Sequence, residues 1–192
     1  MTPIKLCSAV FTLLLASVAP SCLAQPHNPY AGVEQNELST LAPDEVKSLL
    51  AGHGMGYAKA AELNGYPGPL HVVELADRLA LSPEQLGRTQ ALMNAHRSRA
   101  RALGAKLVDA ERALDQLFRK RVASTASVSA AAERVGGLQA QLRTEHLNTH
   151  IAQTALLDVR QIERYAELRG YAATKQGHAP ADGHGVHRPH GQ

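Results

Sequence analysis

The chain has 192 residues, only 4% of them aromatic, and a formal net charge of +3 at pH 7. A mild charge and few aromatic side chains argue against nucleic-acid binding, because unpaired bases stack on aromatic platforms. Catalysis is disfavoured too, since the sequence has no Gly-x-Ser-x-Gly elbow, no phosphate-binding loop and no paired acidic motif. We therefore expect a binding protein and no enzyme.

The first 24 residues have the pattern of a secretory signal peptide. Lys5 precedes an apolar run over residues 9–19, and cleavage is predicted after Ala24. The run is too short to span a bilayer, which needs about 20 apolar residues. Both cysteines, Cys7 and Cys22, lie in this segment, so the mature chain has neither a disulfide nor a thiolate metal site. We expect a periplasmic protein, with a lipid anchor at Cys22 as the alternative.

The mature chain divides into a tether, a helical domain and a tail. Residues 25–37 are polar, whereas 38–171 carry apolar residues at helical spacing. The last part, residues 172–192, is rich in histidine and glycine and is expected to be disordered. Within the domain, three short helices are predicted first, over residues 43–50, 57–63 and 70–79.

Two long helices are predicted to form an antiparallel hairpin. The first covers residues 83–122, and its apolar side chains recur at alternating steps of three and four. The second covers 129–156 with a matching seam, after a turn of small residues near Thr125. A last short helix is predicted over 159–169. The apolar face of the hairpin that the two helices do not bury must pack against the short helices or against a second copy in a homodimer.

Two similar pentapeptides mark helix starts, at residues 81–85 and 157–161. Each has a leucine, a residue suited to the N-cap and a glutamine that can reach back to the cap. The first copy also has proline at the first helical position. The residues are Leu81, Ser82, Pro83 and Gln85 in the first copy and Leu157, Asp158 and Gln161 in the second.

These motifs, together with the signal peptide and the cysteine-free hairpin, resemble a known family. It comprises the Spy/CpxP-like periplasmic stress proteins and their heavy-metal-resistance relatives, the CnrX-like sensors and the ZraP-like zinc-responsive proteins. The resemblance covers residues 38–171 and implies an all-α, bent four-helix protomer in a cradle-shaped homodimer. It further implies either ATP-independent binding of unfolded proteins or sensing of envelope stress and divalent metals, with a membrane-bound sensor or anti-sigma partner. The motif marks the fold and does not separate these activities.

Histidines on the second long helix form the first candidate metal site. His146 and His150 are four residues apart, which places both imidazoles on one helical face. A zinc-protease helix has the same spacing, but Leu147 stands where its general-base glutamate would be. Glu145 and His96 are further candidate ligands, since the antiparallel pairing brings His96 within about one turn of His150. The alternative is that the helix histidines are exposed and that His96 is a seam residue bonded to a neighbour.

The tail is a second, separate candidate for metal binding. Neutral imidazoles on a flexible chain can bind Zn, Cu, Ni or Co ions and would buffer them, with no obligatory cofactor expected. The alternative is an inert tail. The four tail histidines are His178, His184, His187 and His190.

The first long helix carries a basic face. From residue 83 to 122 there are nine basic against four acidic residues. Such a face suits weak binding of unfolded chains, with a plain solvated surface as the alternative. The candidate client-binding residues are Arg97, Arg99, Arg101, Lys106 and Arg112. We therefore predict an envelope-stress or heavy-metal-resistance protein that senses or buffers divalent transition metals, with ATP-independent chaperoning as the alternative function.

Overall fold

A computed structural model of the chain describes residues 36–171 together with Tyr30 and Gly32. Helices are the only regular elements in this part of the chain, which confirms the all-α prediction. No described helix combines the length and apolar character needed to cross a membrane. The helices are α1 (Pro43–Ala51), α2 (Lys59–Glu62), α3 (Pro69–Glu74), α4 (Pro83–Arg119), α5 (Thr125–Thr154) and α6 (Val159–Leu168).

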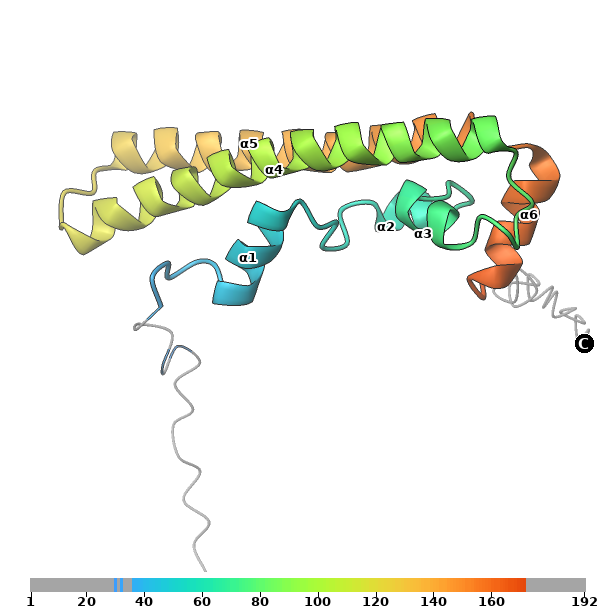
Figure 1. The fold of residues 1–192 in the computed structure, drawn as a ribbon. Helices are drawn as coiled ribbons and strands as arrows, with labels where there is room; N and C mark the ends of the chain where they lie inside the picture. Colours follow the sequence, from blue (N-terminus) through green and yellow to red (C-terminus); the bar gives the residue numbers. More distant parts are fainter. Residues whose placement is uncertain (1–29, 31, 33–35, 172–192) are drawn as a thin grey trace, which may run out of the picture.

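Helices α4 and α5 form the predicted long hairpin (Figure 1). The helices α1, α2 and α3 lie along one side of it, and α6 lies across the end far from the turn. Helix α5 begins earlier than predicted because Ser124 caps it, its side chain accepting a hydrogen bond from the backbone of Ser127. The connection is therefore residues 120–124, centred about three residues before the predicted turn at Thr125.

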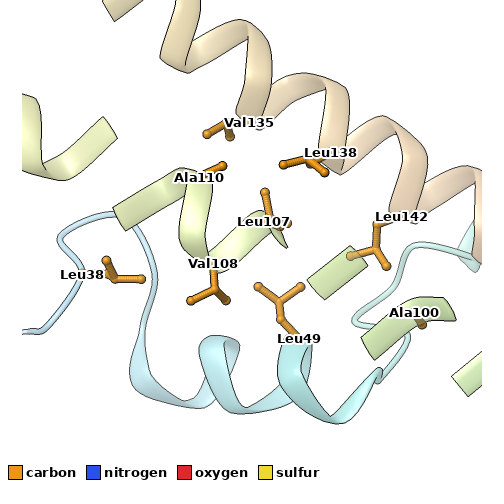
Figure 2. Packing of buried hydrophobic residues seen from close by; sticks show 9 residues of the cluster. All are labelled: Leu38, Leu49, Ala100, Leu107, Val108, Ala110, Val135, Leu138 and Leu142. Atoms are coloured by element: carbon orange, nitrogen blue, oxygen red, sulfur yellow. The ribbon is translucent and has the colours of Figure 1, made fainter. Parts of the chain in front are cut away.

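The larger of two apolar clusters lies where α1 packs on the hairpin, and the smaller one, formed by Val72, Leu79 and Tyr165, lies near α6. Leu49 from α1 meets Leu107 from α4 and Leu142 from α5, all three with at most 2% of their surface exposed (Figure 2). A glycine permits this close approach: a Cβ atom added at Gly104 would lie 2.2 Å from the carbonyl oxygen of Leu49. Leu38, just before α1, is buried in the same cluster.

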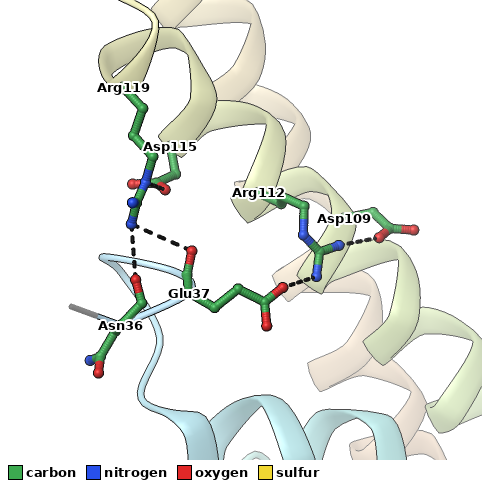
Figure 3. A network of polar contacts seen from close by, with 6 residues as sticks. All are labelled: Asn36, Glu37, Asp109, Arg112, Asp115 and Arg119. Carbon is green, nitrogen blue, oxygen red and sulfur yellow. Dashed lines mark hydrogen bonds and ion pairs between the residues drawn. The ribbon is translucent and has the colours of Figure 1, made fainter. Parts of the chain in front are cut away.

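Polar contacts hold the segment before α1 against the end of α4. The Arg112 guanidinium donates to the carboxylates of both Glu37 and Asp109 at 2.9 Å (Figure 3). Arg119 pairs with the buried carboxylate of Asp115 and donates to the carbonyl of Asn36 at 3.0 Å. Glu37, the last residue of the predicted polar tether, is thus bound to the hairpin.

The two pentapeptide motifs meet at the other end of the hairpin. Ser82 and Asp158 cap α4 and α6 as predicted, and the glutamine of each motif reaches back to its own cap. The two glutamine side chains also bond to each other, with Gln85 Nε2 2.8 Å from Gln161 Oε1 and Gln161 Nε2 3.0 Å from Gln85 Oε1. Gln85 donates further to the carbonyl of Leu156 at 2.9 Å. We call this pair the glutamine clasp, and it joins the start of α4 to the start of α6.

Candidate functional site

A cavity of about 520 Å³ lies between the α2–α3 region and the hairpin, which are in contact around it. Its lining includes a carboxylate, that of Glu62, and the basic side chains of Lys59, Arg97 and Arg169. Every histidine in the described part of the chain lines this cavity. They are His53, His71, His96, His146 and His150.

His96, on α4, is held by the facing helix. Its Nδ1 lies 3.1 Å from Glu145 Oε1 and 3.0 Å from Thr149 Oγ1. Because an ionised carboxylate only accepts hydrogen bonds, Nδ1 carries the proton and Nε2 keeps its lone pair. Burial lowers the pKa of His96, and the hydrogen bond to Glu145 opposes that shift. The pKa of Glu145 is lowered, since hydrogen bonds from Arg99 and His96 outweigh the effect of its burial.

His146 is buried among rings. Only 4% of its surface is exposed, its ring stacks on Tyr57 at 5.7 Å between centroids, and it meets His96 edge-on at 4.5 Å. Burial, with smaller contributions from the charges of His96 and His150, lowers its pKa to about 4. His146 is therefore neutral at pH 7. Its Nε2 is buried and has no hydrogen-bond partner, which normally costs about 1–3 kcal/mol. A ligand could satisfy this nitrogen, either by binding its lone pair or by accepting a hydrogen bond from it.

His150 bonds to the loop between α2 and α3. Its Nδ1 donates to the backbone carbonyl of Tyr66 at 2.8 Å, which in the neutral ring places the lone pair on Nε2. The same Nδ1 lies 3.6 Å from Glu62 Oε2. A glycine makes room for the ring, because a Cβ atom added at Gly68 would lie 2.7 Å from His150 Cε1 and 2.9 Å from Nε2.

Glu62, which sequence reasoning missed, connects the cavity to α6. Its Oε1 accepts hydrogen bonds from the hydroxyls of Tyr165 and, at 3.2 Å, Tyr171, and it lies 3.5 Å from Arg169 Nε. Burial and this carboxylate raise the pKa of Tyr165. The other oxygen, Oε2, is buried without a hydrogen-bond partner. Glu62 lies in a short Ala- and Glu-containing stretch, and no spacing in the sequence singles it out.

The donor types fit a transition-metal cation, but the arrangement is open. Neutral imidazoles and carboxylates are ligands for Zn, Cu, Ni and Co, and the unpaired nitrogen of His146 supplies a free donor. Within the described residues, however, no group of three or more His, Cys, Asp or Glu side chains is gathered closely enough to hold an ion. His96, Glu145 and His146 form one partial set, and His150 with Glu62 forms another.

The structure therefore brings three of the four predicted hairpin ligands, the histidines, to one cavity, whereas Glu145 lies outside its lining and bonds to His96. His146 and His150 share a helical face as predicted, but His146 faces the hairpin interior and His150 faces the α2–α3 loop. The alternative that both are exposed is wrong for the buried His146. His96 does bond to neighbours, as its alternative stated. The four tail histidines lie outside the described residues.

Three of the five predicted client-binding residues have bonding partners within the chain. Arg99 binds Glu145 at 2.9 Å, and Arg101 donates to the carbonyl of Ala51 at 3.2 Å. Arg112 is held by Glu37 and Asp109. Arg97 and Lys106 are exposed, and Arg97 lines the cavity. Much of the predicted basic face thus binds to the chain itself.

A family model described as heavy-metal resistance matches residues 50–164, a range that includes every described histidine. No curated protein and no solved structure matches the chain.

Proposed function

Because the chain belongs to the heavy-metal resistance family, we propose that its histidine-lined cavity binds a divalent transition-metal cation. The single observation that carries this proposal is that all five described histidines line one cavity, although they come from four separate stretches of the chain. A lining of this kind is expected of a cation site, and the unpaired buried nitrogen of His146 costs stability unless a ligand satisfies it.

Three hairpin histidines are the proposed ligands, and they would have to move closer together to share one cation. His146 offers a neutral ring with a free nitrogen, and the hydrogen bonds of His96 and His150 at Nδ1 leave their Nε2 atoms able to coordinate. The carboxylates of Glu145 and Glu62 are the charged groups nearest to these rings. Such a mixed set suits Zn, Cu, Ni or Co, with affinities following the usual order of these metals.

The placement of the cavity supports a sensing role. Its lining comes from the α2–α3 region, from both hairpin helices and from the end of α6. A cation that drew these partial sites together would change how the short helices sit on the hairpin, and a membrane-bound partner could respond to that change. We place this activity in the periplasm, in a homodimer, as the signal peptide and the family resemblance lead us to expect.

Calorimetric titration tests the proposal. Zn, Cu, Ni or Co is titrated into the mature chain, residues 25–192, and into its His146→Ala variant. We expect saturable binding that weakens at least about tenfold in the variant, as for loss of one ligand. The exposed Asn148 lies on the same helix, and Asn148→Ala is the matched control that should bind like the parent. Binding that His146→Ala leaves unchanged would contradict the proposal.

A second candidate function is ATP-independent chaperoning at the mouth of the cavity. Leu63 and Leu70 line the cavity and are 52% and 48% exposed, beside the exposed guanidinium of Arg97. Exposed apolar groups with a positive charge suit weak binding of unfolded chains. The test is suppression of aggregation of a denatured client without nucleotide, and no suppression at an excess of this protein would count against it.

A further inference from the structure

The turn of the hairpin presents apolar and basic side chains together. Phe118, near the end of α4, is 58% exposed, and Val122, in the turn, is 62% exposed. Lys120 and Arg121 lie between them and are exposed as well. The turn is at the end of the hairpin opposite α6 (Figure 1). We infer that this tip, residues 118–122, binds the surface of an anionic phospholipid membrane.

The charge at the tip is positive. No aspartate or glutamate occurs between Asp115 and Glu133, and Asp115 is buried and already paired with Arg119. Among the residues that the structure describes, the side chains of Lys120 and Arg121 have no hydrogen bond or ion pair. The first turn of α5 has no acidic residue either, although helix starts favour them. Cations of this kind beside exposed apolar side chains complement a surface of lipid phosphates.

The backbone at Arg121 indicates that this arginine is not required by the fold. Helix α4 ends in a Schellman motif, in which the N–H of Arg121 donates to the carbonyl of Phe118 at 2.9 Å and that of Val122 to the carbonyl of Leu117 at 3.0 Å. Arg121 has a φ of 55°, in the left-handed region where this motif normally has glycine. An arginine therefore destabilises the turn relative to glycine. An interaction of its side chain with a partner would account for its presence.

The size of the tip favours a membrane over a protein partner. A stable protein–protein interface uses about 20–30 residues from each side, whereas the connection between the helices is residues 120–124. A lipid surface has no such requirement, because long basic side chains reach its phosphates while apolar side chains enter the boundary below the headgroups. Binding would be weak and reversible, since each cation near an anionic surface raises the affinity only about fivefold.

Binding at the tip would leave the cavity away from the lipid. About 33 Å of helix separates Arg97, which lines the cavity, from Arg119 at the end of α4. Substitutions at the tip should therefore leave cation binding in the cavity unchanged. Membrane binding and the proposed function can then be tested separately, and either can fail without the other.

Co-sedimentation with vesicles is the first test. The mature chain, residues 25–192, is mixed at low ionic strength with vesicles of equal parts phosphatidylglycerol and phosphatidylcholine, or of phosphatidylcholine alone. We expect binding to the anionic vesicles only, weakened by added salt. Arg121→Gly should lower the partition coefficient about fivefold, and Phe118→Ser should lower it by a similar factor. Lys106→Ala, which removes an exposed cation from the middle of α4, is the matched control and should bind like the parent.

The stability of Arg121→Gly separates loss of binding from loss of folding. Glycine suits the left-handed backbone at this position, so the free energy of unfolding should stay equal or rise. Equal binding to neutral vesicles, no binding by the parent, or binding that Arg121→Gly leaves unchanged would each overturn the inference. If Arg121→Gly instead weakens suppression of aggregation of a denatured client, and the parent does not bind vesicles, the tip is a surface for unfolded proteins and the membrane inference is overturned.

A fluorescent label tests which end of the hairpin meets the membrane. Residues 25–192 contain no cysteine, so Ala123→Cys carries a single polarity-sensitive dye in the turn. Its emission should shift to shorter wavelength when anionic vesicles are added. The same dye at Ala102→Cys, an exposed position within α4, should show no shift. Equal shifts at the two positions would overturn the assignment of the tip as the binding surface.

Discussion

The two halves of the hairpin are formed by the same pair of helices, α4 and α5, but their buried residues differ in polarity. Near α1 most buried residues are apolar, with Leu107 and Leu142 facing Leu49 (Figure 2), and the carboxylates of Glu111 and Asp115 are buried at the edge of this cluster. Toward α6 the buried residues include His146 and the hydrogen-bonded pair of Thr89 and Gln153. The first half is sealed by a close helix contact, and the second encloses a cavity.

This difference indicates which buried residues stabilise the fold and which are available for binding. Apolar burial contributes roughly 25 cal/mol per Å² and requires no partner geometry. Buried polar groups contribute little net stability and cost more when unpaired. The cavity half has an apolar cluster of its own, formed by Val72, Leu79 and Tyr165, so the contrast is between apolar and polar buried residues, and variants of the two kinds should behave differently.

The largest effect on stability is expected from a substitution that forces α1 away from α4. Gly104→Ala would place a methyl group 2.2 Å from the Leu49 carbonyl oxygen, so α1 must move away from α4. We expect the free energy of unfolding to fall by about 3 kcal/mol, as for severe overpacking. Chemical denaturation measures this.

The control for that variant is another helical glycine. Gly136 on α5 has no atom within 4 Å of an added Cβ. Gly136→Ala should therefore raise stability by up to about 1 kcal/mol through helix propensity. Equal effects of the two substitutions would show that the close contact does not matter.

The next effect should come from the glutamine clasp. Gln85→Ala removes the bonds to Gln161 and to the Leu156 carbonyl and leaves both partners partly buried. We expect a loss of about 2 kcal/mol. Because the two glutamines act as a pair, adding Gln161→Ala should cost less in the Gln85→Ala background than in the parent. Strict additivity in this double-mutant cycle would count against the clasp.

A pH effect should come from the polar contacts at the end of α4. Burial would raise the pKa of Asp115, but hydrogen bonds from Ser39 and Arg119 lower it overall. A folded pKa below the unfolded value of about 3.9 means that this stabilisation is present above pH 4 and is lost as the pH falls through the folded pKa. Asp115→Asn should cost about 1.5 kcal/mol at pH 7, and its difference from the parent should shrink below pH 4. A difference independent of pH would contradict this role.

The smallest effect on stability is expected from His146→Leu, which should change metal affinity instead. The substitution removes a buried ring whose Nε2 has no partner. In the presence of a chelator, stability should stay equal or rise by up to about 1 kcal/mol, while metal affinity falls. Leu142→Ala, one turn earlier on the same helix and 1% exposed, should instead cost about 2–5 kcal/mol. Similar losses of stability in both variants would contradict the proposed difference between the apolar core and the cavity.

The helical fold could be predicted well from the sequence because its signals are local. Heptad spacing identified α4 and α5, and the caps at Ser82 and Asp158 fixed the starts of α4 and α6. The sequence predicts that the second long helix starts at residue 129, whereas α5 starts at Thr125, because Ser124 is one of several small polar residues that could cap it. His96 bonds to Glu145 and Thr149, and Thr149 is the neighbour of His150, so the predicted proximity of His96 to His150 is confirmed.

The site could be predicted only in part because it depends on contacts between distant residues. The spacing of His146 and His150 showed a shared helical face, but it carried no information about which ring would be buried. Glu62 enters the site through the fold of the α2–α3 region, and its bonds to Tyr165 and Tyr171 span more than a hundred residues. The glutamine clasp likewise joins two local motifs by a contact that neither motif contains.

The length of the hairpin has a consequence for how this protein migrates in solution. A 37-residue α4 is about 55 Å long at 1.5 Å per residue, whereas a compact domain of similar size has a radius of gyration near 15 Å. Such a rod has a larger frictional coefficient than a sphere of equal mass. On a gel-filtration column the single chain will therefore elute ahead of globular standards of its own mass, and light scattering is the measurement that counts its copies.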